Sequence, residues 1–183
     1  MSEPREPMRR VVVAGGGQVG VLTAIGLRRA LPSCEVVVVG LPIDPAAFAD
    51  HAATALPFTN ILHDRLGVDE GRLVLAAGAS HRLAVRYFGW GGEGQHGVLT
   101  YGGSSEPAMH SRFAQQWGAG GRNVSGERPA GSLAEVLADA GRFAPPAPGS
   151  ESPIAQIEYA MRWNVPAYRD LLIGIAHQLG VAH

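Results

Sequence analysis

The residues best suited to chemistry form a glycine-rich stretch near the N-terminus. The stretch reads Gly15-Gly16-Gly17-Gln18-Val19-Gly20. In a Gly-x-Gly-x-x-Gly turn the first glycine permits the tight turn, the second admits a pyrophosphate to the backbone, and the third allows close packing of helix on strand. The start of the helix then offers free N–H groups and a positive dipole end to phosphates. The motif therefore predicts a dinucleotide site, with an ordinary glycine-rich turn as the alternative.

An acid that such a site needs is missing from its expected position. A carboxylate about 20 residues beyond the turn should accept hydrogen bonds from the adenosine ribose. Gly40 occupies that position, and Asp44 follows only after Pro42. Losing two charge-assisted hydrogen bonds costs roughly 2–4 kcal/mol after partial compensation. We therefore expect dinucleotide affinity to be weakened about a hundredfold or more.

The surrounding pattern supplies the elements that would position the turn. Residues 10–14 and 35–39 are β-branched runs, and residues 19–30 show helical spacing between them. This order is typical of a βαβ unit that opens an α/β fold. Further along the chain we expect the following: helices at 58–66, 69–79, 108–117, 132–140, 154–161 and 166–179, a strand at 81–88, a helical turn within 45–53, glycine-rich loops over 89–131 and a linker at 144–153.

Composition narrows the classes of function. The formal net charge of -1 gives no reason to expect nucleic acid as a partner. The single cysteine, Cys34, excludes an internal disulfide and favours a reducing, cytoplasmic location. We find no signal peptide, no membrane span and no metal-like spacing among the seven histidines. All 15 basic residues are arginine, so no reaction step of this chain can use a lysine amine.

Several spaced segments together resemble the flavin-dependent tryptophan halogenases. The stretch VVVAGGGQVG at 11–20 is similar to their opening motif, with Val21 at a position that is usually tryptophan. Four later segments are similar in order and spacing: Leu56-Pro57 with LGVDE at 66–70, LAVRYFGW at 83–90, GRFAPP at 141–146 with IEYA at 157–160, and the final helix at 168–183. The resemblance covers residues 10–183 and implies FAD as the cofactor, bound through Gly15, Gly16, Gly17, Gln18, Val19 and Gly20.

Departures from the family pattern put its chemistry in doubt. In the family a lysine delivers the halogen to the indole, and Arg82 stands at that position. Arginine remains protonated in proteins, so its guanidinium is a poor nucleophile and does not form a haloamine. A family glutamate beside the flavin is replaced by Ala53, and the His-Phe-Asp segment reads Arg162-Trp163-Asn164. The family's Trp-x-Trp-x-Ile-Pro motif is absent from the sequence.

The resemblance implies an α/β fold with a Rossmann-like, glutathione-reductase-type FAD-binding start. We expect a flexible N-terminus at 1–9, then a partial FAD-binding domain at 10–183 with a helical and glycine-rich insertion at about 41–153, an incomplete sheet and no substrate domain. Three hypotheses remain: a flavoprotein that binds FAD weakly and does not halogenate, a non-catalytic interaction or regulatory protein, and a truncated remnant. The partner would be a flavin reductase, or another copy that completes the sheet.

Overall fold

The computed structural model describes residues 6–40, 53–89, 92–93, 96–101 and 132–183. The helix predicted at 108–117 lies outside these residues, and so does the helical turn predicted at 45–53 apart from its last residue. The chain divides into two compact units. Unit 1 contains Met1–Ala55, Thr59–Ser80 and Arg162–His183, and unit 2 contains Leu56–Phe58 and His81–Met161. The insertion expected at about 41–153 remains a prediction.

Unit 1 is built on a βαβ opening. Strand β1 (Arg10–Ala14) leads through the glycine turn into helix α1 (Gln18–Ala30), and β2 (Glu35–Val39) returns parallel to β1 with Val12 opposite Val37. Ala182 forms a parallel bridge to Val37, which extends the sheet beyond β2. The β-branched residues of both runs favour strands because they fit a pleated surface.

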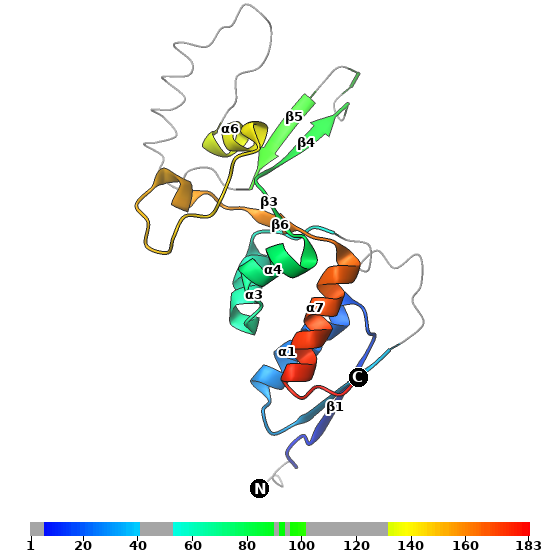
Figure 1. Ribbon diagram of the computed structural model, residues 1–183. Coiled ribbons are helices and arrows are strands. Elements are labelled where there is room, and N and C mark those ends of the chain that lie inside the picture. Colours follow the sequence, from blue (N-terminus) through cyan, green and yellow to red (C-terminus); the bar gives the residue numbers. More distant parts are fainter. Residues whose placement is uncertain (1–5, 41–52, 90–91, 94–95, 102–131) are drawn as a thin grey trace, which may run out of the picture. The chain divides into compact units, whose positions relative to one another are not determined.

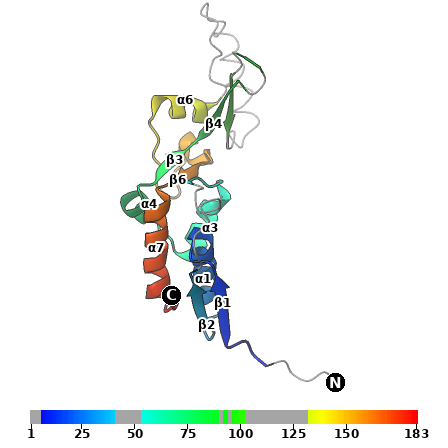
Figure 2. The same cartoon turned by 90° about the vertical axis from the view of Figure 1, so that its right-hand side faces the viewer.

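Helices cover one face of this small sheet. Helix α1 packs on both strands, and α7 (Val165–Gln178) runs alongside α1, as Figures 1 and 2 show. Val36 and Val38 of β2 are buried on the covered face. Val12 of β1 and Val39 of β2 lie on the opposite face and are 57% and 44% exposed. Helices α3 (Phe58–Leu66) and α4 (Glu70–Ala77) follow β2, and α4 packs against α7. The sheet therefore has one covered face and one open apolar face within the described residues.

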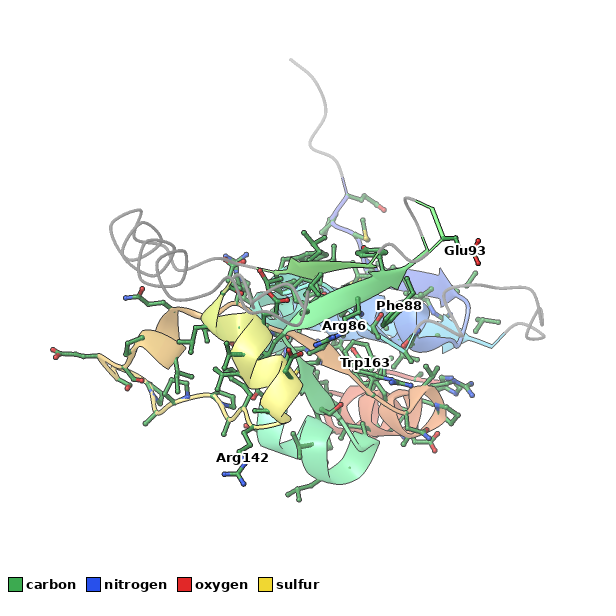
Figure 3. The ribbon with its side chains drawn as sticks, turned by 90° about the horizontal axis from the view of Figure 1, so that it is seen from above. Arg86, Phe88, Glu93, Arg142 and Trp163 are labelled. Atoms are coloured by element: carbon green, nitrogen blue, oxygen red, sulfur yellow. The ribbon has the colours of Figure 1, made fainter. Side chains whose placement is uncertain are left out.

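Unit 2 contains an antiparallel hairpin and a capped helix. Strand β4 (Ala84–Phe88) pairs with β5 (His96–Thr100), and α6 (Leu133–Ala140) packs against both. Its small core consists of Leu83, Ala134 and Ile157, with Leu137, Phe143, Ile154 and Tyr159 against it. The Arg86 side chain, labelled in Figure 3, forms an ion pair with Asp139 of α6. The Ser132 hydroxyl accepts a hydrogen bond from the Glu135 N–H and so caps the start of α6.

Local sequence patterns located most of the elements correctly. Strands 10–14 and 35–39 and helix 58–66 have the predicted bounds. The strand predicted at 81–88 is instead two strands, β3 (Ser80–Arg82) and β4, separated at Leu83. The helix predicted at 154–161 is wrong: a short 3-10 helix (Pro153–Gln156) is followed by strand β6 (Ala160–Arg162). Pairing of β6 with β3, and the burial of Ala160 and Met161, override the helical preference of that segment.

Within the described residues, no helix has both the length and the apolar character that crossing a membrane requires.

Candidate functional site

The glycine turn of unit 1 has a geometry that only glycine satisfies. Gly15 has a φ of 123°, in a region that side chains disfavour, and its N–H donates to the Val39 carbonyl at 2.8 Å. A Cβ on Gly20 would lie 1.9 Å from the carbonyl oxygen of Gly15. Helix α1 can therefore begin this close to the end of β1 only because Gly20 has no side chain. The turn brings together all six residues from Gly15 to Gly20 that the sequence predicts.

The N-terminus of α1 lacks a side-chain cap. Gly17 is the N-cap residue, and no side chain caps the helix there. The first turn carries no acidic residue, and Val19 in that turn is 59% exposed. The first N–H groups of a helix lack partners inside the helix and carry a partial positive charge. The arrangement thus has the hydrogen-bond donors and the positive potential that a phosphate group needs.

Two basic side chains from the C-terminal part of the chain lie beside Gly16. Arg169 of α7 donates a hydrogen bond from Nε to the Gly16 carbonyl at 2.6 Å. An ideal Cβ on Gly16 would lie 3.3 Å from His183 Nε2, 3.4 Å from Gly40 Cα and 3.6 Å from an Arg169 terminal nitrogen. The carboxyl ends of β1 and β2 therefore meet a cationic corner, which we define as Gly16, Gly40, Arg169 and His183. Sequence reasoning missed Arg169 and His183, because no local pattern links residues so distant in the chain.

A buried hydrogen-bonded group of rings supports Gln18 in the turn. The indole N–H of Trp163 donates to Gln18 Oε1 at 3.3 Å, and the Trp163 ring lies 4.4 Å from the Tyr168 ring. The Tyr168 hydroxyl is 2.8 Å from His63 Nε2. Trp163, labelled in Figure 3, and Tyr168 are buried, as expected for core residues. This chain of contacts ties the start of α1 to α3 and α7.

His63 is held in its neutral form. It is 2% exposed, and its Nδ1 atom has no hydrogen-bond partner among the described residues. Burial lowers the pKa of His63 below its ordinary value of 6.5, and the nearby charges of Asp64 and Glu70 oppose that shift only in part. Burial also raises the pKa of the Tyr168 hydroxyl, which therefore keeps its proton. A second proton on His63 would be placed in the core without an acceptor.

We expect the stability of unit 1 to fall in mild acid because of His63. The unfolded histidine gains a proton near pH 6.5, whereas the folded one does so only at lower pH. The free energy of unfolding should thus fall as pH drops below 6.5, by up to about 1.4 kcal/mol per pH unit for one proton. Urea unfolding at pH 7.5 and at successively lower pH would measure this slope. His63→Gln should flatten it, and exposed His177→Gln should not; an unchanged slope in His63→Gln would contradict the assignment.

Arg82, at the position of the family lysine, belongs to unit 2. It ends β3, and its guanidinium carbon lies 5.4 Å from the centre of the Tyr101 ring. Burial raises the pKa of the Tyr101 hydroxyl, and the charge of Arg82 opposes this shift. This geometry is that of a cation–π contact, which uses the arginine as a fixed charge rather than as a nucleophile.

No group of three or more potential metal ligands occurs in the part of the chain that the structure describes. Cys34 is a buried free cysteine directly before β2.

Comparison with known proteins identifies the relatives of this chain. The sequence model of the tryptophan halogenase family matches residues 10–183. A flavin-dependent halogenase from Xanthomonas campestris has a similar structure, with 23% identity and a TM-score of 0.71 over 97% of this chain and 35% of that one. A tryptophan 6-halogenase from Streptomyces toxytricini has 22% identity and a TM-score of 0.70 over 96% of this chain and 34% of that one. No curated protein matches the sequence.

These likenesses establish a shared fold. A third solved structure, a flavin-dependent halogenase from Brevundimonas sp. BAL3, has 22% identity and a TM-score of 0.69 over 96% of this chain and 35% of that one. The chain is thus a mixed α/β protein with small sheets, similar to part of the flavin-dependent halogenase fold. It spans about a third of the length of the solved halogenases that it matches, 34% and 35% in these cases.

Proposed function

Because the chain belongs to the tryptophan halogenase family, we propose that it binds FAD through a Rossmann-like site whose phosphates lie on the turn from Gly15 to Gly20. The observation that carries this proposal is the uncapped start of α1 behind a turn in which a Cβ on Gly20 would overlap the Gly15 backbone. Gly20 lets α1 begin against the end of β1, and the helix start without a side-chain cap leaves its first N–H groups for a phosphate. The family membership supports flavin as the dinucleotide.

The residues present fit one half of FAD better than the other. The α1 N-terminus and the backbone of the glycine turn suit the pyrophosphate, since both supply N–H donors and positive potential. At the ribose end Gly40 offers no side chain, and the described residues place no carboxylate beside Gly16. We therefore propose weak binding, dominated by the phosphates. When bound, reduced FAD would supply the electrons with which the family activates dioxygen for halide oxidation.

The roles of this chain's own residues follow from their contacts. The backbone from Gly15 to Gly20 binds phosphate, and Gln18 is held in place by Trp163. Arg169 fixes the Gly16 carbonyl and so orients the turn. Electrons would come from a flavin reductase as the partner protein. Arg82 would hold an anion or a hydrogen-bonded oxidant and would not carry the halogen.

A charged substitution at Val19 tests phosphate binding without harming the fold. Val19 is exposed in the first turn of α1, where a carboxylate stabilises a helix by about 0.3–1 kcal/mol. The same carboxylate would repel a bound pyrophosphate by roughly 1–4 kcal/mol at about 4 Å. We expect saturable FAD binding by the unmodified chain, measured by flavin fluorescence and by thermal shift. Val19→Glu should weaken that binding about tenfold or more at an unchanged or higher melting temperature.

Val19→Thr is the matched control, because it keeps the shape of the side chain and adds no charge. It should bind FAD like the unmodified chain. Equal FAD affinity in Val19→Glu and Val19→Thr would overturn the assignment of the phosphates to α1. A chain that melts cooperatively but binds no FAD would overturn the proposal itself.

A second candidate function is association with another copy of the chain that covers the open face of the sheet. The open face of β1 and β2 exposes Val12 and Val39, and such an apolar face is commonly covered in α/β proteins. We propose this function if the folded chain fails to bind FAD and sediments as a dimer. A folded monomer without FAD would contradict both candidates and favour a remnant without activity.

A further inference from the structure

The cationic corner beside Gly16 carries a positive charge. A ribose with free hydroxyls is instead usually held by a carboxylate at this position. Arg169 is half-buried, and its Nε atom is already engaged by the Gly16 carbonyl at 2.6 Å. One terminal nitrogen of Arg169, Nη2, and His183 Nε2 both lie close to Gly16, at 3.6 Å and 3.3 Å from an ideal Cβ on that residue. Among the described residues, no acidic side chain forms an ion pair with Arg169. Gly40, at the end of β2, contributes only its Cα atom to this corner.

Charge at this position decides which adenine dinucleotide fits. In dinucleotide-binding βαβ units an acid at the end of the second strand hydrogen-bonds the ribose hydroxyls, whereas an arginine nearby accommodates a 2′-phosphate. The guanidinium suits a phosphate because it presents several N–H donors in a fixed plane. Here the acid position is Gly40, and Arg169 reaches the corner from α7, a helix outside the βαβ unit.

We infer that this corner of the dinucleotide site selects an adenine dinucleotide with a phosphate on its adenosine ribose over one with free hydroxyls. The inference rests on the proposed function only in that the glycine turn must bind the pyrophosphate. It assigns Arg169, assisted by His183, as the specificity-determining residue. FAD, whose adenosine ribose is not phosphorylated, is then the weaker of two ligands that compete for the same turn.

Arg28 provides a control, because it also donates a hydrogen bond from Nε to a backbone carbonyl, at the opposite end of α1 from the glycine turn. Its Nε atom donates to the Leu179 carbonyl at 3.0 Å, just as that of Arg169 donates to Gly16. Both arginines are half-buried, and each links α1 or its turn to the α7 region. Arg28 lies at the C-terminal end of α1, away from the glycine turn. Arg28 also donates from Nη1 to the Pro32 carbonyl, so the loss of Arg28 should disturb the fold at least as much as the loss of Arg169.

The experiment is calorimetric titration of the full chain with NAD⁺, NADP⁺ and FAD. These two nicotinamide dinucleotides differ only in the 2′-phosphate, so the ratio of their dissociation constants isolates that group. We expect NADP⁺ to bind about tenfold or more tightly than NAD⁺, as one charged hydrogen-bond pair would give. The preference should shrink as salt is raised, because both charges are close to the solvent.

Arg169→Gln should bring the ratio close to one, because glutamine can still donate to the Gly16 carbonyl but carries no charge. Arg28→Gln should leave the ratio as it is in the unmodified chain, even if both affinities decline. An equal ratio in the unmodified chain, or an unchanged preference in Arg169→Gln, would overturn the inference.

The FAD titration separates this inference from the proposed function. FAD binding with no preference for NADP⁺ overturns the inference and supports the proposed function. A preference for NADP⁺ in a chain that does not bind FAD overturns the FAD proposal and supports the inference. If a cooperatively melting chain binds none of the three dinucleotides, both are overturned.

Discussion

We expect no chlorotryptophan or bromotryptophan when the purified chain is supplied with tryptophan, FAD, a flavin reductase, oxygen and chloride or bromide. The family route uses a lysine amine to deliver the halogen, and this sequence contains no lysine. Arg82 stands at that position as a delocalised cation, which is a poor nucleophile. Its guanidinium faces the Tyr101 ring at 5.4 Å, a contact that depends on the charge being kept. The expected effect is the loss of the whole reaction.

Liquid chromatography with mass spectrometry would detect the halogenated products at trace levels. The control is the same mixture without the chain, because free flavin and oxygen alone produce some oxidant. Product above that background would show that the lysine is dispensable in this protein. Arg82 would then be the candidate residue that holds the oxidant.

Arg82→Lys should remain inactive. This variant tests whether the lysine amine is the single group that halogenation by this chain lacks. A lysine there would restore the amine, but Ala53 and Gly40 would still stand where the family pattern and a ribose site have carboxylates. Halogenation by Arg82→Lys alone would show that the amine was the single missing group.

The elements of unit 1 could be predicted because their sequence signals are local. The β-branched runs gave both strands with their correct bounds, and the glycine spacing gave the turn between β1 and α1. The same is true of α6, whose capping pair, Ser132 and Glu135, lies within one helical turn. In each case the residues that stabilise the element are also the residues that form it.

The sequence failed where partners come from distant parts of the chain. The segment at 154–161 looked helical, but pairing with β3 makes part of it a strand. The contact between Arg169 and Gly16 joins residues 153 positions apart, and that between His63 and Tyr168 joins residues 105 apart. No spacing rule predicts such pairs. The glycine turn was thus predictable, whereas the cationic corner required the structure.

Gly40→Glu should restore an acid at the ribose end and raise FAD affinity about tenfold to a hundredfold. Each charge-assisted hydrogen bond from a ribose hydroxyl is worth about 1.5–3 kcal/mol, and imperfect geometry would reduce the sum. The substitution fits the fold, because a Cβ on Gly40 would have no heavy atom of the described residues within 4 Å and Gly40 is exposed. Its backbone also lies outside the positive-φ region that favours glycine.

The matched control is Gly40→Gln, which has the same size and no charge. FAD titration by fluorescence should show a clear gain for Gly40→Glu and little change for Gly40→Gln. The new carboxylate would also lie near Arg169 and oppose a 2′-phosphate, so NADP⁺ affinity should fall as FAD affinity rises. Equal FAD affinities of the two variants would mean that the ribose does not reach the end of β2. A gain in FAD affinity together with a loss for NADP⁺ would mean that the charge at this one corner decides which dinucleotide the glycine turn holds.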